Sequence, residues 1–162
     1  MNSPRAIERG IDATLLRIAS RVWPKEDFHG FSGHDLLHAK GSPFFALMYS
    51  QIFWPEFIEF DGMVFLPWVI EDDDDRSRVS AKLQETDRTA VEKAFNFVEV
   101  SSLFGAGKSH TTAEEDRLLA DYLASMWRAK LAADTALDDA RVEVTEPDVA
   151  NEAGLTVYRF RL

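Results

Sequence analysis

Cysteine is absent from this 162-residue sequence. Its absence excludes disulfides, thiolate zinc sites, iron–sulfur clusters and cysteine nucleophiles. The sequence also has no G-x-S-x-G motif of serine hydrolases and no G-x-G-x-x-G motif of dinucleotide-binding proteins. We therefore expect no cofactor, and the missing catalytic motifs favour a protein that is not an enzyme.

Long apolar runs are missing as well. The N-terminal residues alternate between apolar and charged types, which is not the pattern of a signal peptide. The longest apolar run of helical character, from Pro43 to Pro55, is shorter than the roughly 20 residues that a membrane span needs. We expect a cytoplasmic protein that does not contact a membrane.

Basic residues are few, with 18 Lys and Arg against 28 Asp and Glu, giving a net charge of −10. An acidic surface repels phosphate backbones, so we expect no binding to nucleic acid. The same charge can steer the protein toward a basic protein partner. The length and the 46% hydrophobic content fit one globular domain over residues 1–162.

Lys and Arg are completely absent from the stretch Ser42–Ile70, which holds nine of the nineteen aromatic residues. Ser42 and Pro43 suit the N-cap and first position of a helix over 43–54, and Pro55 ends it. Because this helix is apolar almost all round, we expect it to be buried.

A β-hairpin over residues 57–66 is predicted directly after this helix. Asp61-Gly62 between two apolar runs favours a type I′ turn, which pairs Phe60 with Met63 and Glu59 with Val64. Both faces of the hairpin are apolar, so we expect it to form the central pair of a sheet.

The remaining elements complete an α+β fold. We expect a loop over the acidic run 71–75 and a helical turn around 34–39. We also expect three further helices: residues 4–22, a helix with a Thr89/Glu92 capping box that continues to about residue 103, and a helix from the Thr112/Glu115 capping box to about 136. The fold class is therefore about four main helices packed on an antiparallel sheet of about four strands, built from the central hairpin 57–66 and a C-terminal hairpin 141–162.

One candidate binding motif is Gly107-Lys108-Ser109, which resembles the end of a phosphate-binding loop. That motif needs a glycine five residues before Gly107, where Ser102 stands, and a preceding strand, where we expect a helix. We interpret these residues as a false match that forms a turn between two helices. The backbone N–H groups at the start of the next helix could still hold an adventitious anion.

Three histidines form a second candidate. His34 and His38 are four residues apart, a spacing that can place two ligands on one metal, and His29 or Asp27 could complete the site. Asp35 stands where a zinc protease has glutamate, and Gly33 and Gly41 bracket the segment closely. We expect loop histidines rather than a metal site.

Glu59 is the third candidate, because the predicted pairing makes it the sole charge on one apolar face of the hairpin. A buried, unpaired carboxylate would have a raised pKa and would be a catalytic candidate, together with His34 and His38. The alternative is that Glu59 lies at the rim of the sheet or pairs with Arg159 or Arg161.

Three functional hypotheses follow. The first is a non-enzymatic protein-binding module, such as an inhibitor or immunity-like binder of a basic partner. The second is a metal-dependent hydrolase or metal-binding protein that uses the His29/His34/His38 loop. The third is a homo-oligomeric structural protein that pairs through apolar surface left on the hairpin.

Overall fold

The computed structural model of the chain describes residues 4–103, 111–145 and 153–161. Its α-helices are α1 (Pro4–Val22), α2 (Gly33–Lys40), α3 (Pro43–Phe53), α4 (Asp73–Leu83), α5 (Arg88–Phe95) and α6 (Ala113–Ala132). Its strands are β1 (Ile58–Phe60), β2 (Met63–Phe65), β3 (Val98–Glu99), β4 (Ala140–Thr145) and β5 (Gly154–Arg159), and short 3₁₀ helices lie at η1 (Val100–Ser102) and η3 (Thr135–Leu137). None of the helices in these ranges is both long and apolar enough to cross a membrane.

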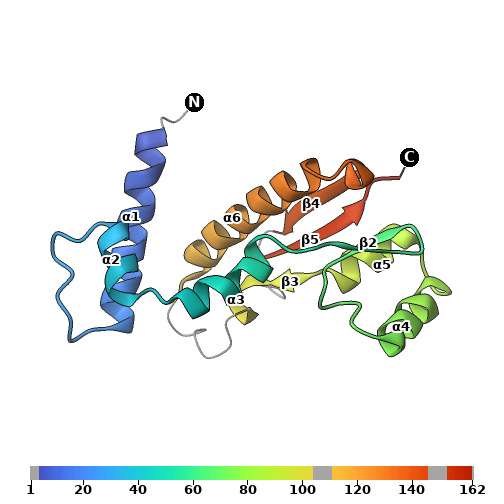
Figure 1. Cartoon of the computed structure of the whole chain (residues 1–162), viewed down its shortest axis with the longest axis horizontal. Helices are drawn as coiled ribbons and strands as arrows, with labels where there is room; N and C mark the ends of the chain where they lie inside the picture. Colours follow the sequence, from blue (N-terminus) through green and yellow to red (C-terminus); the bar gives the residue numbers. More distant parts are fainter. Residues whose placement is uncertain (1–3, 104–110, 146–152, 162) are drawn as a thin grey trace.

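The arrangement is α+β, as predicted. α1 and α2 pack together at one end, α6 runs along β4 and β5, and α4 and α5 lie toward the other end (Figure 1). The prediction of four main helices was too low, because α2 and α4 are true helices. Asp72 caps α4, and its side chain accepts hydrogen bonds from the backbone N–H groups of Asp74 and Asp75. The acidic run 71–75 is therefore partly helical, since carboxylates are favourable at a helix N-terminus.

The central hairpin has the predicted turn and register. Asp61 and Gly62 both have positive φ, 50° and 69°, as a type I′ turn requires. Phe60 pairs with Met63 and Glu59 with Val64. Residues Met63–Leu66 are fully buried, whereas β1 is half-buried with Glu59 exposed. The hairpin is therefore covered fully only along β2, and it forms a sheet of its own instead of the expected central pair.

The C-terminal hairpin also forms, with β4 and β5 antiparallel and β5 flanked on its other side by β3. β3 was not predicted. The helix expected to run to residue 103 ends at Phe95, and Asn96 caps it. Its N-cap is Asp87 rather than Thr89, so the predicted Thr89/Glu92 capping box is wrong. The Thr112/Glu115 capping box of α6 is confirmed.

A single four-stranded sheet was the other wrong expectation. The described strands form a two-stranded sheet, β1–β2, and a separate three-stranded sheet in the order β3-β5-β4. β2 and β5 lie next to each other, yet backbone groups of both strands bond to side chains of α5. Glu92 and Asn96 thus bond to backbone groups that would otherwise form hydrogen bonds directly between β2 and β5.

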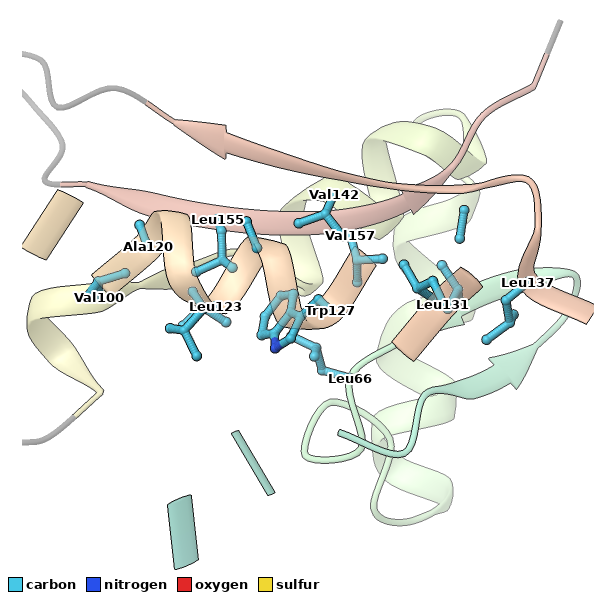
Figure 2. Packing of buried hydrophobic residues seen from close by; sticks show 14 residues of the cluster. Leu66, Val100, Ala120, Leu123, Trp127, Leu131, Leu137, Val142, Leu155 and Val157 are labelled. Atoms are coloured by element: carbon cyan, nitrogen blue, oxygen red, sulfur yellow. The ribbon is translucent and has the colours of Figure 1, made fainter. Parts of the chain in front are cut away.

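The main core lies between α6 and the strands. Trp127 of α6 is fully buried among Leu123, Leu66 and Val157 (Figure 2). Its indole N–H donates a 2.8 Å hydrogen bond to the backbone carbonyl of Ile52 at the end of α3. The ring of Phe57 meets it edge-on, with the ring centroids 6.1 Å apart. Trp127 therefore fixes both the helix α3 and the entry to the hairpin.

β4 is an edge strand in the part of the chain that the structure describes. The backbone carbonyl of Asp139 accepts a hydrogen bond from the N–H of Phe160. In an antiparallel pair every second residue bonds to the neighbouring strand, so the N–H and C=O groups of Ala140 and Val142 point away from β5. Arg128 donates to Val142 O and Arg141 donates to Ala140 O, at 2.9 and 2.8 Å. Guanidinium groups thus occupy two carbonyls on the open side of the strand.

Candidate functional site

Two fully buried polar side chains, Glu92 of α5 and Asn96 at the C-cap of α5, are four residues apart and lie between β2 and β5. The Asn96 amide donates to the carbonyls of Val64 and Val157, both at 2.8 Å, and its oxygen accepts from Leu66 N at 2.9 Å. Both N–H groups of the amide and its oxygen are therefore engaged with backbone groups of the strands.

Glu92 has a similar role beside Asn96. One carboxylate oxygen accepts from Val64 N at 2.7 Å, and the other accepts from Arg159 N at 3.2 Å. Arg161 forms an ion pair with the second oxygen at 2.5 Å and reaches Gly62 O at 2.7 Å. The charge of Glu92 is thus compensated by two backbone N–H groups and one guanidinium group.

Arg159 connects this cluster to Glu59. Its guanidinium group forms ion pairs with Glu59 and with Asp139, the latter at 2.8 Å. The Arg159 side chain is only 13% exposed, whereas Glu59 is 55% exposed. Of the two alternatives left open for Glu59, the structure shows the ion pair with Arg159 at the rim of the hairpin.

Glu92 and Asn96 were not predicted as partners of the strands. Their spacing of four residues on one helix, next to the apolar pair Val91 and Phe95, is the signal that could have placed both on the inner face. Glu92 was instead assigned to a helix cap. The cluster as a whole binds strands together, and we assign it to the fold rather than to catalysis.

The three histidines lie on the surface. His34 and His38 are exposed on the short helix α2, and His29 is exposed in the preceding loop. Asp35 accepts hydrogen bonds from Ser32 in a capping box, and its pKa is lowered by these backbone and side-chain hydrogen bonds. Among the described residues, no three His, Asp or Glu side chains gather as a metal site requires.

Gly107, Lys108 and Ser109 lie outside the described residues. The helix that follows them begins with the N-cap Thr112, whose backbone N–H is bound by the side chain of Glu115 at 2.9 Å. The Glu115 carboxylate is buried and forms ion pairs with Arg17, at 3.1 Å, and with Arg21, both from α1. A carboxylate of the chain itself thus occupies the N-terminal turn where an adventitious anion was considered.

The burial of α3 differs most from what the sequence predicts. The helix was expected to be buried, but none of its residues is buried. Phe44 is 65% and Leu47 is 71% exposed. We define the α3 patch as six exposed apolar residues of this helix and its C-cap: Phe44, Phe45, Leu47, Met48, Tyr49 and Trp54.

In the part of the chain that the structure describes, α3 packs against the main core through its C-terminal end. Ile52 and Phe53 pack against the main core, and Trp127 binds the carbonyl of Ile52. The preceding turns pack their rings on each other, with Phe45 stacked on Tyr49 at 6.0 Å. Figure 1 shows α3 between the α1–α2 pair and the hairpin, and α3 contacts α6.

Charged groups flank the patch without entering it. From Gly41 to Pro55 the sequence has no charged residue. Lys40 precedes the segment and pairs with Glu26, and Glu56 follows it and pairs with Lys130 at 2.7 Å. The ammonium group of Lys130 also lies 5.9 Å from the ring centre of Trp54.

Contiguous apolar surface is the property that sets α3 apart from the rest of the described molecule. Such a surface binds a partner mainly by the burial of apolar area. The sequence matches no protein-family model, and comparisons with curated proteins and with solved structures find no significant similarity.

Proposed function

We propose that this chain is a non-enzymatic protein-binding module and that the α3 patch is its docking surface. The observation that carries the proposal is a helix of eleven residues, Pro43–Phe53, with no buried residue and no charge. Aromatic residues and Met are the types that interfaces favour, and charged residues are the types that interface centres avoid.

The size of the patch supports binding to a macromolecule. Its six side chains are on average about half exposed, and at roughly 200 Å² for a large side chain they present about 600 Å² of apolar surface. This value lies at the upper end of the roughly 300–600 Å² that the largest patch on a monomer usually covers. An exposed area of this size is costly unless a partner covers it.

A protein fits the patch better than a membrane surface. Helices that lie on membranes carry Lys and Arg on their polar face to hold anionic headgroups. α3 has neither residue, and the net charge of −10 opposes approach to an anionic bilayer.

Photochemical crosslinking tests the proposal. A benzoylphenylalanine replaces Leu47 in one variant and Gln84, exposed at the end of α4, in a control variant. Illumination of cells that express each variant should give a discrete protein adduct at position 47 and none at position 84. An α3 patch without any protein adduct, or equal adducts at both positions, would overturn the proposal.

The hypothesis of a basic partner stays a prediction. It requires that association with such a partner slow steeply between low and high salt, because steering between opposite charges is screened. An association rate that is indifferent to salt would count against it.

A further inference from the structure

We infer that the α3 patch binds the α3 patch of a second copy of this chain, with the two helices antiparallel about a two-fold axis near Met48. This inference rests on the proposed docking role of α3 and names its occupant. Met48 is the middle residue of Pro43–Phe53, so an axis at this position brings the whole length of each helix against the other.

The area of the α3 patch is sufficient for an interface between two copies. Two patches of about 600 Å² can bury at most about 1,200 Å² together, which is the lower end of the roughly 1,200–2,000 Å² of specific interfaces. Leu37 of α2, which is 67% exposed and lies against Gly41 just before α3, would add to this area.

The apolar composition of the α3 patch also favours a second copy of the chain. Interfaces that form transiently are about as polar as the rest of a protein surface, whereas interfaces between identical chains have more apolar centres. Two copies of this chain repel each other, because each carries a net charge of −10. The patch contains no charged group, so this repulsion is weakest where two patches meet. A heterologous basic partner would gain nothing electrostatic at the centre of this surface.

The charges at the two ends of α3 favour an antiparallel arrangement of the two helices. Lys40 lies three residues before Pro43, and Glu56 lies three residues after Phe53. In an antiparallel pair, Lys40 of each copy comes to the end of the helix where Glu56 of the other copy lies. The arrangement is self-complementary and also sets the two helix dipoles in opposite directions, whereas a parallel pair would bring like charges together.

Glu56 is free to make this contact. Its side chain is 84% exposed although it pairs with Lys130, and Lys40 is 24% exposed beside Glu26. Each end of the paired helices would then carry two lysines and two glutamates in alternation, a small network rather than one isolated surface pair.

Sedimentation equilibrium of the full chain tests the inference. The protein should show twice its single-chain mass of 18.4 kDa and dissociate on dilution. Phe44→Asp should raise the dissociation constant by more than about tenfold, because it removes an aromatic contact and buries a carboxylate among apolar side chains. Phe160→Asp is the matched control, because Phe160 is also about half exposed but lies at the end of β5, and it should leave the mass unchanged.

Orientation is tested by disulfide crosslinking, which is clean because the chain has no cysteine of its own. Under mild oxidation Met48→Cys should crosslink to itself in the dimer, since residues near the two-fold axis face each other. Gln84→Cys should remain monomeric on a denaturing gel. Glu56→Lys should weaken the dimer, and adding Lys40→Glu should restore part of the affinity.

A single-chain mass at millimolar concentration would overturn the inference, as would a dimer that Phe44→Asp leaves intact. The crosslinking experiment at position 47 separates this failure from that of the proposed function. An adduct with a different protein keeps α3 as a docking surface and rejects the second copy, whereas no adduct rejects both.

Discussion

Glu92 and Arg161 form an ion pair, 2.5 Å between oxygen and nitrogen, in which the carboxylate is fully buried and the guanidinium group reaches the surface. The pair stabilises the contact between α5, β2 and β5, because the same carboxylate also binds backbone N–H groups of Val64 and Arg159. A charged group of this kind holds the fold together only while all its partners are present.

Glu92→Ala should therefore lower the free energy of unfolding by about 2–4 kcal/mol, because two buried N–H groups lose their acceptor. Urea denaturation followed by circular dichroism measures the change. Glu143→Ala is the control, since Glu143 pairs with Lys93 at the surface and its loss should cost less than about 1 kcal/mol. Equal effects of the two substitutions would contradict the role assigned to Glu92.

Asn96→Asp should destabilise the protein by about 3 kcal/mol or more at neutral pH. The substitution turns an amide that donates to the carbonyls of Val64 and Val157 into a carboxylate facing two acceptors. The carboxyl group must then be protonated in the folded state, so the deficit should shrink as the pH falls toward 4. A pH series of thermal unfolding, with Asn96→Ala as the variant that lacks this titration, tests the prediction.

Glu59→Gln should reduce stability by about 0.5–1 kcal/mol. An uncompensated buried carboxylate would have given the opposite result, a gain in stability. Glu59 is instead half exposed and paired with Arg159, so its loss removes a favourable but solvent-screened interaction. Chemical denaturation of this variant beside the wild type distinguishes the two outcomes by sign.

Glu115→Gln should lower stability by about 1–2 kcal/mol at pH 7, because the charge-assisted hydrogen bonds to Arg17 and Arg21 are lost. Burial alone would raise the pKa of Glu115, but hydrogen bonds from Arg21 and Thr112 and the positive charges of Arg21 and Arg17 lower this pKa below the usual range of a glutamate. A carboxyl group whose pKa is lower in the folded than in the unfolded state stabilises the folded protein at pH values above the unfolded-state pKa. This stabilisation is lost as the pH falls through the folded-state pKa. The difference between variant and wild type should therefore vanish in acid.

Chelation should leave the melting temperature unchanged. His29, His34 and His38 are all exposed, and the acidic side chain of Asp35 is engaged with Ser32. Thermal unfolding with and without EDTA, after metal analysis of the purified protein, measures the effect. A stoichiometric metal ion whose removal lowers the melting temperature would revive the metal-binding hypothesis.

Local patterns predicted local structure well in this chain. Asp61-Gly62 fixed the turn and pairing of the hairpin because only that turn suits two positive φ values. Thr112 and Glu115 fixed the start of α6 by reciprocal hydrogen bonds within one helical turn. Both signals depend on residues close together in the sequence.

Contacts between distant residues were not predictable in the same way. Glu92 suits a helix cap by local pattern, and only the presence of Val64 and Arg159 beside it gives it another partner. The apolar character of α3 was read correctly, but apolarity indicates that a surface is to be covered and does not say by which chain. The predicted four-stranded sheet failed because α5 inserts side chains where two strands would have paired.

The arginines along β4 bear on how the protein behaves at high concentration. An open strand edge is a template for pairing with another molecule, and such pairing can continue without limit into aggregates. Arg128 and Arg141 occupy the carbonyls of Val142 and Ala140, so an incoming strand would have to displace two charged donors. The β4 edge is thereby protected against open-ended strand addition, which is compatible with the proposed pairing of two copies through α3.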